Sequence, residues 1–197
     1  MREHKGRRLF ITGIPTSGKS YLAAMLAEEM GGIVVKLDDF RDALEFDDRY
    51  KQWVNFYFNQ DEETYLTTTS PEQMWENLKL QSEALWPAFL EHIDSYAEEP
   101  ALVIFESVNI LPHLAHRDLG FPGVCLIGAS YKETLERNQK DPRWSDDNAR
   151  LQEMEANMFF NVERPRYKEE AEKYGYAVFE DFETALQATR KILAKNT

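Results

Sequence analysis

The sequence predicts one α/β domain built on a five-stranded, doubly wound parallel sheet, and three observations support this. The chain of 197 residues is 43% hydrophobic, which suffices for one substantial core. Apolar runs of strand length alternate with helical stretches. These runs are apolar on both faces, which is typical of parallel strands that helices cover on two sides. The five runs span residues 8–13, 33–39, 101–107, 124–130 and 176–181.

The helices between these runs have recognisable boundaries. Residues 19–30 are rich in Ala, Leu, Met and Glu, and Gly31 with Gly32 predicts the end of a helix there. A second helix is predicted to begin at Ser70 as N-cap, with Pro71 at its first position. Pro87 predicts a kink or break in it.

Two regions depart from the simple alternation of strand and helix. Residues 41–98 form a helical insertion between the second and third strands. Residues 131–165 are polar and rich in arginine. Neither region has the composition of an interdomain linker, so residues 1–197 are predicted to form one domain that carries both regions.

Composition and charge exclude several classes of partner. Lys and Arg number 23 and Asp and Glu 35, giving a net charge of −12. This charge repels polyphosphate backbones, so no nucleic-acid partner is expected. No apolar run reaches the roughly 20 residues of a membrane helix, and the one after the charged N-terminus is too short for a signal peptide. Cys125 is the only cysteine, so the chain forms no internal disulfide. We expect a cytoplasmic protein; nothing in the sequence indicates its oligomeric state.

The segment GIPTSGKS is the most specific signal in the chain. Gly13-x4-Gly18-Lys19-Ser20 matches the phosphate-binding pattern G-x-x-x-x-G-K-[ST], with a strand before it and a helix after it. Glycines let backbone N–H groups surround phosphate oxygens, and the helix directs its positive end toward them. Lys19 would bridge the outer phosphates and Ser20 would hold Mg²⁺. We therefore expect ATP and Mg²⁺ as cofactors. The predicted nucleotide-binding residues are Gly13, Pro15, Thr16, Ser17, Gly18, Lys19 and Ser20.

Acidic residues end the second and third predicted strands, at the sheet edge where α/β proteins bind ligands. Glu106 could orient Mg²⁺ or its water shell. An aspartate at Asp38 or Asp39 could accept the proton of an attacking hydroxyl. The alternatives are a solvated strand-end charge for Glu106, and a helix N-cap for one of the two aspartates.

These motifs together resemble those of the nucleoside-kinase-like P-loop kinases, which include uridine kinase, nicotinamide riboside kinase and chloramphenicol phosphotransferase. The resemblance rests on GIPTSGKS, LDDF and ALVIFES and covers about two thirds of the chain. It implies a sheet order of 2-3-1-4-5, Asp38 as general base, Asp39 near metal or substrate, and Glu106 near Mg²⁺. One departure is Ser107, because the family commonly has glycine after this glutamate.

The resemblance also implies that residues 1–197 form one kinase domain, in which the insertion 41–98 builds the substrate pocket and residues 131–165 form a mobile lid. The predicted lid contains arginines of the kind that neutralise a transferring phosphoryl group. Arg137 and Arg143 are the preferred candidates for this catalytic role, ahead of Arg150, Arg164 and Arg166. The alternative is a solvated helix face on which the arginines pair with neighbouring acids.

The insertion supplies candidates for the acceptor pocket. Arg41 follows the aspartate pair and could hold an anionic acceptor. Trp53, Tyr57 and Trp75 could stack on a planar substrate, although clustered aromatic residues more often belong to the core. Cys125 is predicted to be a small core residue.

The motifs predict a kinase that transfers the γ-phosphate of ATP to a hydroxyl of a small metabolite. One alternative is a nucleoside monophosphate kinase, although the acidic segment DEETYL (61–66) does not favour a phosphorylated acceptor. A second alternative is a P-loop ATPase that acts as a switch on a protein partner.

Overall fold

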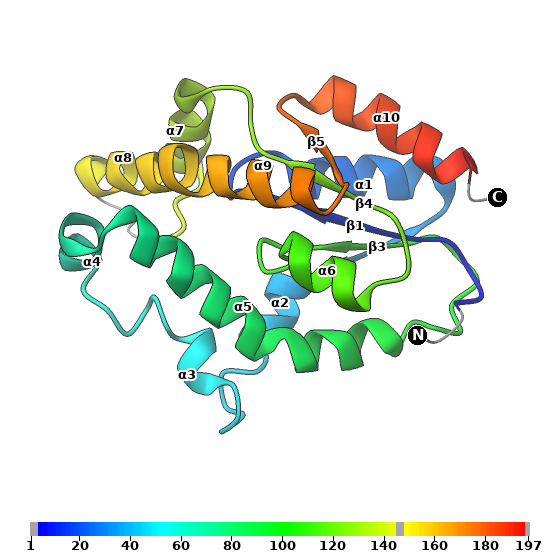
Figure 1. The fold of residues 1–197 in the computed structure, drawn as a ribbon, viewed down its shortest axis with the longest axis horizontal. Helices are drawn as coiled ribbons and strands as arrows, with labels where there is room; N and C mark the ends of the chain where they lie inside the picture. Colours follow the sequence, from blue (N-terminus) through cyan, green and yellow to red (C-terminus); the bar gives the residue numbers. More distant parts are fainter. Residues whose placement is uncertain (1–3, 145–147, 196–197) are drawn as a thin grey trace.

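The computed structural model describes residues 4–144 and 148–195, and its centre is a five-stranded sheet (Figure 1). The strand order is β2-β3-β1-β4-β5, and every neighbouring pair is parallel. Both the fold class and the strand order are therefore as predicted. The strands are β1 (Arg8–Thr12), β2 (Ile33–Lys36), β3 (Val103–Glu106), β4 (Gly123–Leu126) and β5 (Ala177–Phe179).

Helices cover both faces of this sheet. In Figure 1, α1 and α10 lie above the sheet and α2, α5 and α6 lie below it. The helices are α1 (Lys19–Met30), α2 (Leu37–Asp42), α3 (Lys51–Val54), α4 (Glu62–Thr68), α5 (Pro71–Asp94), α6 (Pro112–Asp118), α7 (Tyr131–Lys140), α8 (Ala149–Asn157), the π-helix η1 (Met158–Glu163), α9 (Arg164–Lys173) and α10 (Phe182–Lys195).

The strands separate two hydrophobic cores because successive side chains point to opposite faces. On β1, Leu9 and Ile11 pack with α1 and α10, whereas Phe10 packs on the other face with α5, α6 and α9. All three side chains are fully buried, and burial of each stabilises the fold by roughly 1.5–3 kcal/mol. Cys125 is fully buried on the face of Phe10, as predicted, and burial raises the pKa of its thiol to about 12.

A third and smaller core joins the insertion to the segment predicted to form the lid. It contains Tyr65 from α4, Met74 from α5, Leu151 from α8 and Phe159 from η1. In Figure 1 these elements gather at the end of the molecule away from the two termini. Residues 145–147 of the predicted lid lie outside the described residues. The insertion and the lid thus share apolar contacts that do not involve the sheet.

The long helix of the insertion begins as the sequence predicts. The hydroxyl of Ser70 accepts the Gln73 N–H at 3.2 Å, and Pro71 is the first helical residue. Pro87 lies inside α5, which continues through it, and Figure 1 shows a bend along the helix. A proline removes one helical hydrogen bond and deflects the axis, so the predicted kink is present and a break is not.

The second strand is shorter than the sequence indicates. β2 ends at Lys36, and α2 begins directly at Leu37 with Lys36 in the N-cap position. Asp38 and Asp39 therefore lie in the first turn of α2, and the expectation that one of them is the N-cap is wrong. Acidic side chains are favourable in this turn because the exposed N–H groups give the helix start a positive end.

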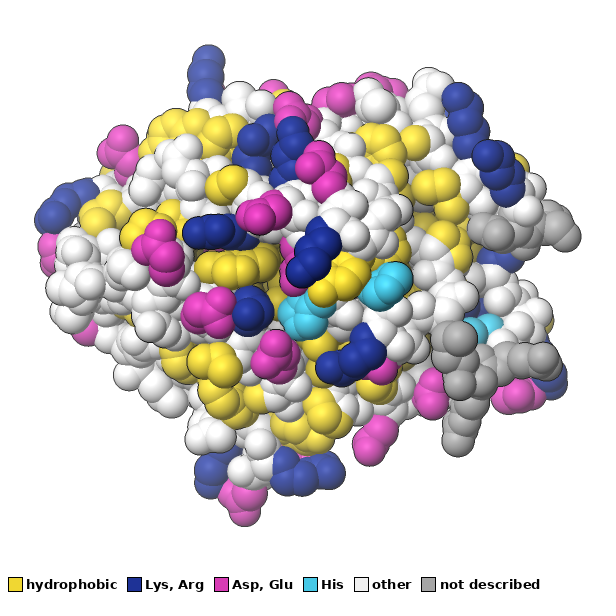
Figure 2. All heavy atoms as spheres, viewed as in Figure 1, with side chains coloured by type: hydrophobic (Ala, Val, Ile, Leu, Met, Phe, Trp, Pro, Cys, Tyr) yellow, Lys and Arg dark blue, Asp and Glu magenta, His cyan; other side chains and the backbone are white. Residues whose placement is uncertain are grey.

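Charge is distributed in both signs over the face that Figure 2 shows, where basic and acidic side chains are interspersed. Near the contact of α5, α6 and α9, His113 lies 2.6 Å from Glu170 and 3.3 Å from Glu83.

Among the helices of the described residues, none is both long enough and apolar enough to span a bilayer.

Candidate active site

The loop after β1 has a backbone that requires glycine. Gly13 has φ +126°, and a Cβ on it would lie 2.0 Å from the Leu126 carbonyl oxygen of β4. Gly18 has φ +97° and occupies the N-cap position of α1. Residues with a side chain rarely adopt such backbone conformations, so glycine at these two positions lets the loop curl beside β4. The first N–H groups of α1 consequently face the interior of the loop, as an anion site needs.

Lys19 and Ser17 both donate to the Ile14 carbonyl inside this loop, at 2.7 Å and 2.8 Å. Lys19 is buried, and burial lowers the pKa of its ammonium, while the Glu106 and Asp38 carboxylates act in the opposite direction. The buried Thr16 hydroxyl has no hydrogen-bond partner among the described residues. An ammonium and a free hydroxyl directed into one loop fit the oxygens of a triphosphate.

Of the three residues predicted to lie near Mg²⁺, Ser20 and Glu106 lie together, and within the described residues Asp39 forms no hydrogen bond with either of them. The register of the sheet sets Glu106 beside Ile11 of β1, and the Ser20 hydroxyl donates to the Glu106 carboxylate at 3.1 Å. Burial raises the pKa of Glu106, and the Lys19 ammonium partly offsets this. One hydroxyl and one carboxylate fit Mg²⁺, which usually keeps several waters and takes further oxygens from phosphates. No cluster of three or more His, Cys, Asp or Glu placed to bind a metal occurs among the described residues.

Asp38 and Asp39 have different surroundings. The Ser107 hydroxyl donates to Asp38 Oδ1 at 2.6 Å, and the Arg41 guanidinium lies 3.8 Å from the same oxygen. Asp39 is exposed, and no side-chain hydrogen bond or ion pair of Asp39 is found within the described ranges. Asp38 is thus held in one orientation on the side of Lys19, and Asp39 is not.

Ser107 belongs to a buried polar network that the sequence did not reveal. Its hydroxyl accepts the Asn109 N–H at 2.9 Å, so its own proton is directed to Asp38. The amide of Asn109 donates to Gln81 at 3.1 Å and to Ser82 at 2.9 Å, both on α5. The network therefore connects the Asp38 carboxylate to the long helix of the insertion. The one signal in the sequence was Ser107 itself, which departs from the glycine expected from the resemblance.

Arg41 is largely committed to protein partners. Its guanidinium pairs with Asp42 at 2.9 Å and donates to the Asn109 side-chain oxygen at 3.3 Å. Its charge also acts on the Tyr57 hydroxyl. The predicted capture of an anionic acceptor by Arg41 would require these contacts to break.

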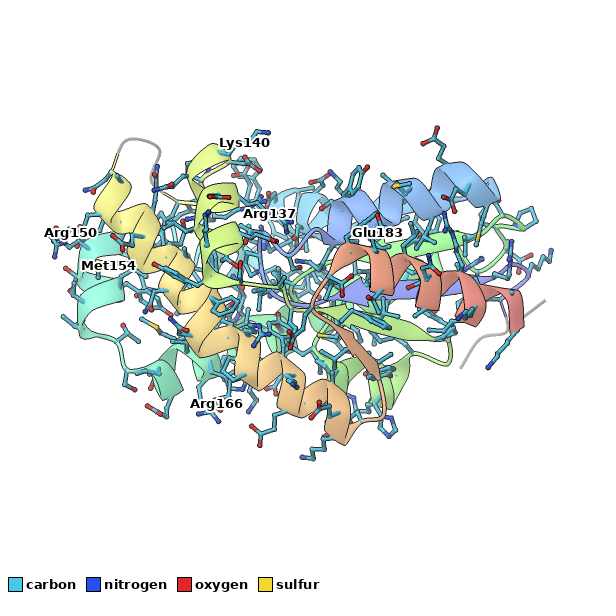
Figure 3. The ribbon with its side chains drawn as sticks, turned by 90° about the horizontal axis from the view of Figure 1, so that it is seen from above. Arg137, Lys140, Arg150, Met154, Arg166 and Glu183 are labelled. Atoms are coloured by element: carbon cyan, nitrogen blue, oxygen red, sulfur yellow. The ribbon has the colours of Figure 1, made fainter. Side chains whose placement is uncertain are left out.

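The lid arginines fall into two groups. Arg137 donates to the Thr16 carbonyl at 3.0 Å and so lies against the phosphate loop, while Arg143 pairs with Asp141 but still acts electrostatically on Lys19. The others point elsewhere: Arg150 pairs with Glu63, Arg164 with Glu180, and Arg166 with Glu72 and Glu169. In Figure 3, Arg137 projects from α7, Arg150 lies near α4, and Arg166 lies on α9.

The aromatic residues of the insertion mostly belong to the core, as the alternative predicted. Trp75 is buried and contacts the Tyr167 ring edge-on, with ring centroids 5.3 Å apart. Trp53 packs against the same core, and Tyr57 packs against the small third core.

No family model matches the chain, and no curated protein matches it in sequence. Solved structures do match over nearly the whole length. A shikimate kinase from Acinetobacter baumannii has 12% identity, covers 98% of this chain and 96% of its own, and has a TM-score of 0.54. A deoxyadenosine kinase from M. mycoides with bound dATP has 15% identity, coverage of 95% and 99%, and a TM-score of 0.53.

The chain has the P-loop kinase fold. A third structure, a protein from Thermus thermophilus, has 19% identity, coverage of 99% and 100%, and a TM-score of 0.58. At such low sequence identities the comparisons show the fold alone. The function has to be inferred from the residues that this kinase fold brings together.

Two buried glutamates in the lid half of the kinase fold were not among the predicted site residues. Glu155 of α8 accepts from Asn138 at 2.8 Å, and burial raises the pKa of its carboxyl to about 7. Glu163 ends η1, and burial raises the pKa of its carboxyl to about 8, with Glu155 adding to this and Lys19 opposing it. Neither glutamate belongs to a recognisable sequence motif. They become neighbours of the site only because the lid packs against the phosphate loop.

Proposed function

We propose that this chain is a kinase that transfers the γ-phosphate of ATP to a hydroxyl of a small molecule. The observation that carries the proposal is the oriented carboxylate of Asp38 on the side of Lys19, next to a complete phosphate loop. A phosphate loop alone would serve any ATPase. An aspartate held by a buried serine supplies what a phosphoryl acceptor needs in addition, which is a base for its proton.

The residues would divide the work as follows. The N–H groups of Gly13–Ser20 bind the phosphates, and Lys19 turns from the Ile14 carbonyl to the outer phosphate oxygens. Ser20 and Glu106 hold Mg²⁺, which neutralises phosphate charge when bound. Asp38 accepts the proton of the acceptor hydroxyl as its oxygen bonds to the γ-phosphorus, and the bond from that phosphorus to the β-phosphate oxygen breaks to leave ADP.

The lid arginines would stabilise the charge that spreads over the transferring group. Arg137 already lies against the phosphate loop, and Arg143 is electrostatically coupled to Lys19. Closure of the lid over the loop would also exclude water, which would otherwise accept the phosphate.

Two observations support this proposal over the alternatives. Structures with this fold include shikimate kinase and deoxyadenosine kinase, which act on small molecules. A nucleoside monophosphate kinase would need free cations for a phosphorylated acceptor, and the nearest cation to Asp38, Arg41, is bound by Asp42 and Asn109. Membership of the nucleoside-kinase-like group and a cytoplasmic location both stay predictions.

The experiment is to measure ADP release from Mg·ATP with nucleosides, nucleotides, sugars, sugar acids and amino alcohols as acceptors. We expect acceptor-dependent turnover that Lys19→Ala and Asp38→Asn each lower by at least about a hundredfold, while Asp38→Asn still binds ATP. Asp39→Asn is the matched control and should retain most activity. ATP binding without stimulation by any acceptor would refute the kinase proposal and favour the switch.

A further inference from the structure

One carboxylate in the candidate active site is buried and has no partner. Glu163 retains only 5% of its exposure, and within the described residues its side chain takes part in no hydrogen bond and no ion pair. Burial of a charged group without a partner is strongly unfavourable, so such a group stays protonated until a partner from outside the chain, such as a ligand, pairs with it. Glu163 also ends a π-helix, and such segments occur frequently at functional sites.

The neighbours of Glu163 place it on the acceptor side of the site. Its charge interacts with Lys19 of the phosphate loop and with Glu155 of the lid helix. It also acts on three tyrosine hydroxyls, namely those of Tyr57, Tyr65 and Tyr167. Tyr167 is in turn coupled to Asp38. Glu163 therefore lies between the phosphate loop, the candidate base and the insertion.

Lys19 is the cation whose charge acts on Glu163. It faces the phosphates in the proposed reaction, and ATP would draw it further toward its own oxygens. Arg164, the next residue in the chain, pairs with Glu180. With ATP bound, Glu163 would have no cation from the described chain, and the acceptor is the remaining component that can supply one.

We propose that the acceptor is an amino alcohol, and that Glu163 determines this specificity by pairing with its ammonium group. This inference rests on the proposed kinase activity. The phosphate still goes to a hydroxyl, whose proton passes to Asp38, while the amine stays protonated and serves only for recognition. A buried carboxylate gains most from a cation, because the low local dielectric strengthens the pair. An acceptor with a carboxylate or phosphate in the same position would be repelled by Glu163 and Glu155.

The test uses matched acceptors that differ in one group. Glucosamine, glucose and gluconate form one set; ethanolamine, ethylene glycol and glycolate form a second; aminoglycosides and their neutral deaminated counterparts form a third. For the set that is turned over, we expect kcat/KM for the amine to exceed that for the neutral and acidic members at least tenfold. Glu163→Gln should lower kcat/KM for the amine at least tenfold, through KM, and so reduce its advantage.

A pH series supplies a second readout that a merely structural role would not change. Between pH 6 and pH 8 the Glu163 carboxyl loses its proton, so KM for the amine should fall as pH rises in the wild type. In Glu163→Gln this fall should disappear. Glu153→Gln, which neutralises an exposed glutamate on the preceding helix α8, is the matched control and should behave as the wild type. Melting temperatures of both variants verify that they fold.

The outcomes separate the inference from the proposed function. Turnover of neutral or acidic acceptors with no preference for amines would overturn the amino-alcohol assignment and leave the kinase standing. An unchanged preference in Glu163→Gln would overturn the role of Glu163. ATP binding with no turnover of any acceptor class would refute both proposals together.

Discussion

Ser107 shows how much one side chain at the end of a strand can determine. Its hydroxyl receives the Asn109 N–H and donates to Asp38, so the proton has a single direction. A hydrogen bond to a charged group contributes roughly 1.5–3 kcal/mol. In this chain the hydrogen bond from Ser107 orients the Asp38 carboxylate.

Replacement of Ser107 by alanine should therefore lower kcat by about tenfold, which corresponds to about 1.4 kcal/mol, and leave KM for ATP unchanged. The reason is that Asp38 would lose its orientation while the phosphate loop stays intact. Steady-state kinetics with saturating ATP measure both constants. Thr189→Ala removes another fully buried hydroxyl, on α10, and serves as the control. A kcat in Ser107→Ala equal to that of the control would refute the role of Ser107.

At the scale of elements, the lid docks on the insertion through an aromatic side chain. Trp144 follows Arg143 and contacts Tyr57 and Tyr65, with ring centroids 5.8 Å and 5.7 Å apart. Such aromatic pairs contribute roughly 0.5–1.5 kcal/mol each beyond their burial. The contact holds the segment of Arg143 over the site.

Trp144→Ala should loosen the lid and lower kcat by about tenfold. It should also raise ATP hydrolysis in the absence of acceptor, because water would enter the open site. The melting temperature should change little, since the main cores on the sheet are untouched. Phe46→Ala removes an aromatic side chain of the insertion that is 86% exposed, and should leave all three measurements unchanged. Loss of stability without a change in rates would contradict the proposed coupling.

Elements whose signals are local were predicted well from the sequence. The capping residues of α5 lie within four positions of one another, so the start at Pro71 could be recognised. The end of β2 could not, because the apolar pattern through Leu37 fits a strand or a buried first helical turn equally. In the structure Leu37 is a fully buried residue in the first turn of α2.

At the scale of the whole molecule, the two buried glutamates make stability depend on pH. The pKa of Glu163 is about 8 and that of Glu155 about 7 in the folded chain, both above the ordinary value near 4.5. Between pH 4.5 and pH 8 the folded state thus holds protons that the unfolded state has lost. The free energy of unfolding contributed by these groups falls as pH rises through this window.

We therefore expect Glu163→Gln to be more stable than the wild type at pH 8, and the difference to shrink toward pH 5. Calorimetric melting of both proteins from pH 5 to pH 8 measures this, and histidine contributions cancel in the comparison. A difference that is independent of pH would show that Glu163 does not titrate in this range.

The phosphate loop could be predicted because it is one contiguous segment, and the sheet order because the resemblance to nucleoside-kinase-like kinases implied it. The acceptor site could not be predicted from the sequence, because its residues come together only through tertiary packing. Asn109 follows β3, Gln81 lies on α5 and Glu163 ends η1, and no spacing rule connects these positions. Arg41 illustrates the same limit. An arginine at this position suggested a site for an anionic acceptor, but its guanidinium is bound by its neighbours Asp42 and Asn109.

The separation of the cores by the sheet has a consequence for how such a chain can change over time. The helix that follows the phosphate loop, α1, packs on one face with α10, whereas α5 packs on the opposite face. Substitutions that reshape the insertion therefore leave the packing of α1 against α10 untouched. A new preference for one alcohol over another could arise by drift in residues 41–98 while α1 keeps its place on the sheet.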